Sequence, residues 1–173
     1  KVVEDCAEAF GSFFKNKSAG NFGFISAFSF NGNKIITAGG GGVICTNDKI
    51  ISSKAKHLTT TAKKNHKWEY FHDEVGYNYR MPNINAALIC AQIERLNDIK
   101  RNKKELYNEY KYSFSKQGIE LCAVPKGLDW NYWLFSLRFD NIKERNTFLK
   151  YSHKEKVLCR PVWNLIYELP MYK

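Results

Sequence analysis

The sequence lacks long apolar runs and paired cysteines. No stretch of 18 apolar residues occurs in the 173-residue chain, so we expect no membrane-spanning helix. The five cysteines are isolated from one another, without a C-x-x-C pair or the Cys/His spacing of zinc sites, so no metal centre is expected. An odd number of isolated thiols is typical of a reduced, cytoplasmic protein.

Acidic residues are also in short supply. The chain has 27 Lys and Arg against 17 Asp and Glu, which gives a net charge of +10. The basic residues concentrate at 54–67 and 100–104, and no nucleic-acid-binding motif or RNA-binding aromatic signature accompanies them. A solvated, lysine-rich surface is therefore the preferred interpretation, and a nucleic-acid-binding function ranks last. A phosphate-bearing cofactor or nucleotide substrate could also use part of this charge.

Strand-like and helix-like segments alternate along the chain, which predicts an α/β fold. Apolar residues recur at helical spacing from Ile84 to Phe114, so we expect one helix of about thirty residues or two with a break, ended by Gly118. The other expected helices are 49–58, capped by Asn47-Asp48, and 142–151. The expected strands are 1–3, 22–30, 43–46, 119–124, 133–139 and 157–159.

Lys34 stands in an unusual place for a lysine. It follows an apolar strand and the turn Asn31-Gly32-Asn33, and it precedes Ile35-Ile36. A lysine between two buried segments is costly to desolvate unless it is neutralised or paired. A Schiff base removes the ammonium charge, so this lysine is a candidate for covalent catalysis, against the ordinary interpretation of a surface residue.

Asp5 and the glycine run 39–42 are weaker signals. Asp5 would lie at the carboxyl end of a strand, where open α/β sheets bind ligands, although a capping carboxylate is an equally ordinary interpretation. The four glycines are not followed by Lys-Ser or Lys-Thr, and they lack the strand–glycines–helix order of a dinucleotide site. A tight turn with unusual backbone angles and close approach is the preferred interpretation.

Three ordered segments together are more specific than any one of them. The stretches VVEDCAEAFGS, FGFISAFSFNGNKIITAGGGG and HDEVGYNYRMPNINAALICAQIERL resemble the DegT/DnrJ/EryC1/StrS family of sugar aminotransferases, over about nine-tenths of the chain. The resemblance implies an α/β fold of the aspartate-aminotransferase type, which is fold type I of the pyridoxal-phosphate enzymes. HLTTTAKKNHKWEYFHDEVGYNYR and CRPVWNLIYELPMY look most like enzymes that aminate UDP-linked 4-keto-6-deoxy-N-acetylhexosamines.

The resemblance also implies roles for five residues. Lys34 would carry pyridoxal 5'-phosphate through a Schiff base and shuttle the proton, and Asp5 would pair with the pyridine nitrogen. Ser29 would donate to the cofactor phosphate. Asn78 would reach the phosphate in the neighbouring subunit's site, so a homodimer is expected. Glu8 would lie near the cofactor ring, where the wider family often has Gln or His.

The implied activity is transfer of an amino group from glutamate to C4 of a nucleotide-linked 4-keto-6-deoxy sugar, for bacillosamine- or legionaminic-type surface sugars. Alternatives are a GDP-perosamine-type synthase and a non-catalytic remnant of such an enzyme. The C3-dehydratase branch has His at the lysine position, so Lys34 argues against it. Phe24 stands where many relatives have Asp, and its effect is open.

The resemblance further implies how the chain is divided. Residues 1–97 would be the C-terminal part of the cofactor-binding large domain, and 98–173 an incomplete small domain. The relatives carry an N-terminal half with a Gly-Thr phosphate loop and an aromatic that covers the cofactor ring, and neither precedes Lys1. The sequence is therefore expected to be a fragment.

The 173-residue chain by itself should fold poorly and bind pyridoxal phosphate weakly. Its apolar strands lack partners, and each Å² of apolar surface left in water forfeits roughly 25 cal/mol. A cofactor titration followed by absorbance and thermal melting checks this. Stoichiometric, micromolar binding with a cooperative melt would contradict the expectation.

Overall fold

The computed structural model describes residues 1–173 and divides into two compact units, Lys1–Ser136 and Leu137–Lys173. The first unit contains all five residues implied in the cofactor site. The domain boundary expected near residue 97 concerns the architecture of the complete enzyme and stays a prediction. No helix combines the length and apolar character needed to cross a membrane.

The main sheet of the first unit has three strands in the order β1-β4-β5. β1 (Val3–Asp5) and β4 (Ile25–Ser29) are parallel, with Asp5 paired with Ala27, and β5 (Gly42–Cys45) is antiparallel to β4. β1 therefore begins two residues later than expected and includes the acidic pair rather than ending before it. A smaller antiparallel sheet has β2 (Phe13–Phe14) in the centre, between β3 (Lys17–Ser18) and β6 (Leu128–Asp129).

β4 is covered less completely than its apolar composition predicts. Ser26 and Phe30 are buried, but Ala27 is exposed, and so is its partner Ile44 on β5. The face of the sheet that carries Ala27 and Ile44 is thus open.

The glycine run confirms the expected turn between β4 and β5. Gly39 and Gly41 have φ of +78° and +85°, which non-glycine residues rarely adopt. At Gly42, a Cβ atom would lie 2.3 Å from the carbonyl oxygen of Phe28, so only glycine lets β5 approach β4. No phosphate-binding role is needed to explain these glycines.

A small apolar core fixes the segment that follows Lys34. Phe30, Ile35, Ile36, Ala38 and Ile89 are buried together, and Ile36 is only 1% exposed. The backbone N–H of Thr37 also donates to the side chain of Gln92 at 2.9 Å. The residues after Lys34 are therefore anchored on helix α2 (Asn83–Glu94).

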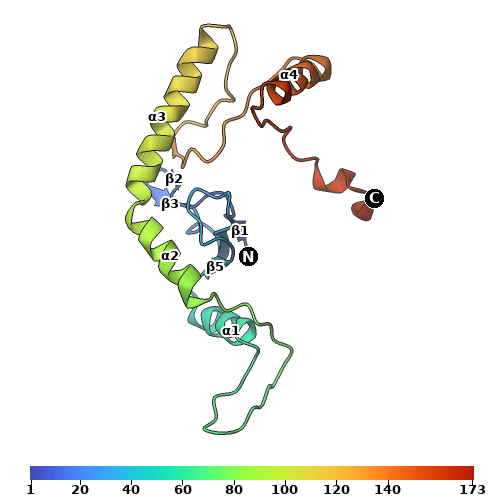
Figure 1. Cartoon of the computed structure of the whole chain (residues 1–173). Helices are drawn as coiled ribbons and strands as arrows, with labels where there is room; N and C mark the ends of the chain where they lie inside the picture. The colour runs from blue at the N-terminus through green and yellow to red at the C-terminus, as the bar shows by residue number, and fades with distance from the viewer. The chain divides into compact units, whose positions relative to one another are not determined.

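The helices agree with the sequence expectations. α1 (Lys49–Thr59) is capped by Asp48, whose carboxylate accepts from the backbone N–H groups of Ile50 and Ile51. The long apolar repeat forms two helices, α2 (Asn83–Glu94) and α3 (Leu96–Ser115), which meet at Arg95 and follow one another in Figure 1. In the second unit, α4 (Ile142–Lys154) is capped by Asn141 and is followed by the short turns η1 (Ile166–Glu168) and η2 (Pro170–Tyr172).

The strands expected at 119–124, 133–139 and 157–159 do not form. The first two segments are joined by a backbone bond from Cys122 N–H to the Ser136 carbonyl, at 2.8 Å. The aromatic residues of 133–139 instead pack on different elements: Phe135 contacts the rings of Tyr107 and Tyr110 on α3, and Phe139 contacts Phe148 on α4. At 157–159, Val157 N–H closes the end of α4 by bonding to the Ser152 carbonyl.

The carboxylate of Glu4 holds the loop that precedes β4. It accepts backbone N–H groups from Gly20 at 2.9 Å, from Phe22 at 2.6 Å and from Gly23. The bond from Gly23 is the largest influence that lowers the pKa of Glu4 below its ordinary value, and it acts against partial desolvation. The loop is therefore tied to β1 by the charged form of Glu4.

Glu4→Gln should destabilise the protein above the ordinary carboxyl pKa of 4.5. Because the folded-state pKa is lowered, the stabilisation by wild-type Glu4 is complete above that value and is lost as the pH falls through the folded-state pKa. The difference between wild type and variant in free energy of unfolding should thus be largest near pH 7 and smallest near pH 3. Urea unfolding at several pH values measures it.

Glu105→Gln, a change on the exposed surface of α3, is the matched control and should leave the unfolding curve nearly unchanged. Equal pH dependence of wild type and Glu4→Gln would contradict the proposed hold on the loop.

Candidate active site

The carboxyl edge of the parallel strand pair brings two predicted residues together. Asp5 ends β1 and pairs with Ala27, and Ser29 ends β4 two residues further on. The carboxylate of Asp5 accepts from Ala7 N–H at 3.1 Å and remains exposed. The hydroxyl of Ser29 accepts from Asn31 N–H at 3.3 Å. A carboxylate and a hydroxyl thus stand at one edge, where α/β sheets bind ligands.

Lys34 lies at the end of the turn that leaves β4, and its backbone N–H bonds to the carbonyl of Asn31 at 3.1 Å. Its side chain is only 11% exposed. The ammonium forms an ion pair with the carboxylate of Glu8 and lies 4.7 Å from the centre of the Trp133 ring. Lys34 is therefore partnered on two sides, as a poorly solvated charge requires.

Trp133 is a site residue that the sequence expectations missed, since they placed it on a strand. Its indole N–H donates to the carbonyl of Asn33 at 2.5 Å, next to Lys34 in the chain. Its own backbone N–H donates to the side chain of Asn131 at 3.1 Å. Trp133 is a hundred residues from Asn33 in the sequence, and no local pattern links the two.

Cys6, which follows Asp5, is not a nucleophile. It is 3% exposed. Burial, together with the neighbouring Glu4 charge, raises the pKa of its thiol to about 11. At neutral pH the thiol stays protonated, which does not suit a nucleophile.

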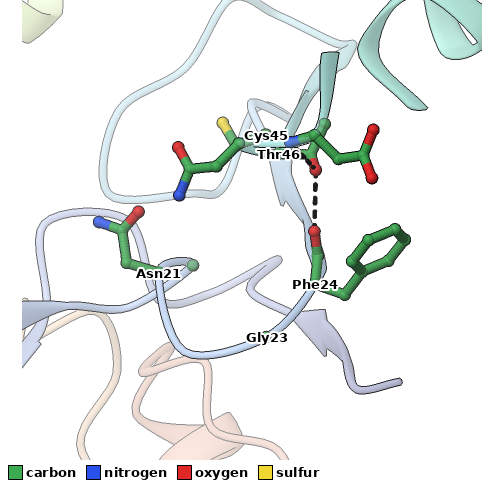
Figure 2. A pocket seen from close by; sticks show the side chains of 8 residues that line it. Asn21, Gly23, Phe24, Cys45 and Thr46 are labelled. Carbon is green, nitrogen blue, oxygen red and sulfur yellow. Dashed lines mark hydrogen bonds between the residues drawn. The ribbon is translucent and has the colours of Figure 1, made fainter. Parts of the chain in front are cut away.

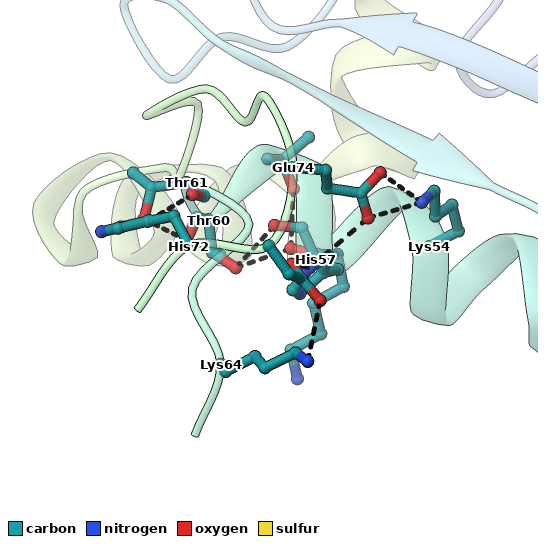
Figure 3. A network of polar contacts seen from close by, with 10 residues as sticks. Lys54, His57, Thr60, Thr61, Lys64, His72 and Glu74 are labelled. Atoms are coloured by element: carbon teal, nitrogen blue, oxygen red, sulfur yellow. Dashed lines mark hydrogen bonds and ion pairs between the residues drawn. The ribbon is translucent and has the colours of Figure 1, made fainter. Parts of the chain in front are cut away.

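Asn78 lies on the exposed loop between α1 and α2, where it forms an isolated bridge with Thr60. This loop is fastened to α1 by a polar network (Figure 3). The ring of His57 contacts Asp73 at 2.6 Å, and the ammonium of Lys54 contacts Glu74 at 2.5 Å. Asn78 thus belongs to a loop that is fixed to α1.

The carboxylates of this network could in principle hold a metal with His57, because their ligand atoms lie within 4.8 Å of one another. Lys54 pairs with Glu74 and Lys64 with Asp73, so cations of the chain already neutralise both. The hydrogen bond with His57 is the main cause that keeps the pKa of Asp73 below its ordinary value. The group is better described as an ion-pair network that shapes the loop.

A hollow of about 310 Å³ lies at the opposite end of β4 (Figure 2). It is lined by Asn21, Gly23 and Phe24 from the loop before β4, by Cys45 at the end of β5 and by residues 46–48 after it. The hydroxyl of Thr46 donates to the carbonyl of Phe24 at 2.8 Å across it. It contains none of the five predicted site residues and is distinct from the Lys34 site.

The groups around Lys34 fit pyridoxal phosphate chemically. The cofactor needs an amine for its aldehyde, a carboxylate for its pyridine nitrogen and hydrogen-bond donors for its phosphate. Lys34, Asp5 and Ser29 supply these three types of group. Asp5 is exposed and Glu8 keeps 46% of its side chain exposed, so their open sides are available to a ligand.

Comparison with known proteins identifies the family. The model of the DegT/DnrJ/EryC1/StrS aminotransferase family matches residues 1–173. The chain belongs to this family. It is 39% identical over 171 residues to GDP-perosamine synthase of Escherichia coli O157:H7, covering 99% of this chain and 46% of that protein. It spans about half the length of the curated relatives it matches.

A second DegT/DnrJ/EryC1/StrS relative carries a different nucleotide in its name. UDP-4-amino-4,6-dideoxy-N-acetyl-beta-L-altrosamine transaminase of Campylobacter jejuni is 33% identical over 116 residues, covering 66% of this chain and 31% of that protein. The family therefore includes enzymes for both GDP-linked and UDP-linked sugars.

The fold agrees with this family. Spr1654 of Streptococcus pneumoniae, in its PLP form, matches with a TM-score of 0.85 at 22% identity, covering 98% of this chain and 45% of that one. The predicted family and fold type I are thereby confirmed. Pyridoxal phosphate is the cofactor indicated for this family, as predicted.

Proposed function

We propose that the complete protein is a pyridoxal-phosphate-dependent aminotransferase that moves an amino group from glutamate to C4 of a nucleotide-linked 4-keto-6-deoxy sugar. The product would enter surface-polysaccharide or glycan synthesis. The observation that carries the proposal is the environment of Lys34. In an aminotransferase family member, this lysine is almost buried at the carboxyl edge of the sheet, between Glu8 and the Trp133 ring.

Lys34 needs a proton acceptor before it can react. Its ammonium must lose a proton to become a nucleophile, and Glu8 Oε1, which bonds to Lys34 Nζ, is the acceptor already in place. The same pair can return the proton to Nζ, because the carboxylate stays next to the amine. Glu8 is therefore assigned to proton transfer at Lys34, beyond the general proximity to the cofactor ring that the sequence implies.

Asp5 and Ser29 are assigned to binding. Asp5, at the end of β1, would pair with the pyridine nitrogen, and Ser29, at the end of β4, would donate to the phosphate. When bound, pyridoxal phosphate supplies the electron sink that withdraws charge from the carbon bearing the amino group. The chain's own contribution is to hold these groups at fixed positions on rigid strands.

A homodimer completes the proposal. Asn78 is exposed on a loop that is fixed to α1, which suits a role in the phosphate site of a neighbouring subunit. The division into a large-domain part, 1–97, and a small-domain part, 98–173, and the cytoplasmic location are proposed on the same family basis.

The nucleotide is the finer point. The chain motifs favour a UDP-linked substrate, whereas the 39% identity to a GDP-perosamine synthase favours the GDP-linked alternative. Lys34 and Asp5 cannot distinguish the two nucleotides, because their proposed roles concern the cofactor. Both UDP-linked and GDP-linked sugars are therefore tested as substrates.

Lys34→Ala should abolish turnover and the absorbance of protein-bound cofactor, because no other group both anchors the cofactor and shuttles the proton. Borohydride trapping followed by peptide mapping measures the attachment site. Lys17→Ala, a change on the exposed strand β3, is the control and should retain activity. A trapped peptide that lacks Lys34 would refute the assignment.

Amination assays with UDP-linked and GDP-linked 4-keto-6-deoxy sugars, with glutamate as donor, test the substrate. We expect kcat/KM to differ by at least about tenfold between the two, since buried polar groups that match one nucleotide are left unpaired by the other. Turnover of neither sugar by a protein that traps cofactor at Lys34 would overturn the nucleotide-sugar proposal while leaving the cofactor assignment intact.

A further inference from the structure

Asn131 is one of four buried polar residues of the chain, at 3% exposure, and it joins two segments that are far apart in sequence. Its amide nitrogen donates to the carbonyls of Glu8 at 2.6 Å and Phe10 at 2.9 Å. Its amide oxygen accepts from Trp133 N–H at 3.1 Å, and its backbone N–H donates to the Ser12 hydroxyl at 3.1 Å. Three of these hydrogen bonds attach Asn131 to the loop after β1, and the fourth joins Asn131 to Trp133.

The side chain of Asn131 suits this place because an amide offers two donors and an acceptor. Asp in its place would meet the two carbonyl oxygens with a negative charge, and Ala would leave both unpaired. Buried polar groups without partners are costly. The amide therefore supplies two of the three bonds that hold the two segments together.

The backbone between Asn131 and Trp133 is also constrained. Tyr132 has a φ of +58°, a left-handed conformation that is uncommon for an aromatic residue. Such strain persists only where the surroundings fix the backbone. Here the bonds of Asn131 fix it on one side, and the indole bond of Trp133 to Asn33 fixes it on the other.

Glu8 and Trp133, which both contact the Lys34 ammonium, are also both hydrogen-bonded to the side chain of Asn131. Glu8 gives its carbonyl to Asn131 and its carboxylate to Lys34. Trp133 gives its backbone N–H to Asn131 and its ring face to Lys34. The position of the reacting nitrogen is thus set through Asn131.

We propose that Asn131 is a positioning residue of the active site, and that the Trp133 ring it orients forms one wall around Lys34 Nζ and excludes water from that side. The inference rests on the proposed function of Lys34. An amine held in one place between a carboxylate and an aromatic face reacts from one geometry, which is what catalysis by positioning requires. Nothing in the local sequence around Lys34 supplies this wall.

The test measures how fast Lys34 reacts with acetic anhydride in the protein without cofactor, by peptide mass spectrometry. Lys100 is the internal control in the same sample. It is comparably covered, at 15% side-chain exposure, and it bonds to the carbonyl of Gly11 and to Asp129. A general loosening of the structure would raise the labelling rates of both lysines together.

Trp133→Leu should raise the labelling rate of Lys34 about fivefold, as expected for the loss of a contact of this kind, and should leave Lys100 unchanged. Trp133→Phe, which keeps a ring face, should restore most of the protection. Asn131→Ala and Asn131→Asp should both increase Lys34 labelling. Trp130→Phe, in a neighbouring ring that packs on Tyr107 and Tyr132, is the matched control and should have no effect.

Unchanged Lys34 labelling in Trp133→Leu would overturn the proposal, and so would an equal rise at Lys34 and Lys100. If Asn131→Ala does not fold, Asn131→Asp tests the positioning role of Asn131, and the two Trp133 variants test the wall around Lys34. Borohydride trapping of added cofactor on Lys34 of the wild type tests the proposed function separately. Trapping at Lys34 with no labelling change in the variants would reject only the wall.

Discussion

The pairing of one nearly buried ammonium is the interaction on which the site depends. Lys34 stands between an apolar strand and the buried pair Ile35 and Ile36, so it cannot be solvated as a surface lysine is. Glu8 neutralises its charge, and the Trp133 ring gives it a polarisable face. These contacts hold the amine ready without exposing it.

The apolar core lies next to the candidate site in the sequence, because the buried residues Ile35 and Ile36 directly follow Lys34. Ile36 anchors the segment just beyond Lys34, and its truncation to Ala would cost about 2–5 kcal/mol, typical of large-to-small changes in a core. Thr37 bonds to Gln92 on α2, so the helix supports the same turn. Rigid support of this kind keeps a reacting group within a fraction of an ångström of one position.

Several local elements could be predicted from the sequence. Asp48 as a cap, the break in the long helical repeat and the glycine turn all follow from residue chemistry that acts within a few positions. Glu8 and Lys34 could both be assigned to the site from the sequence, since both belong to motifs of the family, although their ion pair was not predicted. The expected strands at 119–124 and 133–139 are wrong, because apolar side chains that alternate along a segment can also pack singly on other elements, as Phe135 does on α3. The contact between Trp133 and Lys34 spans about a hundred residues and depends on a buried Asn, which no periodicity reveals.

The grip of Glu4 on residues 20–23 has a consequence for the other end of the sheet. Glu4 pairs with Ser26, so the loop it holds determines at which residue β4 enters the sheet. Side chains alternate along a strand, and a slip of one residue would turn the Ser29 hydroxyl to the opposite face, away from Asp5. This carboxylate thereby sets the alignment of Asp5 and Ser29, the two strand-end residues proposed to bind the cofactor. An added residue between Gly23 and Ser29 would put this edge out of phase.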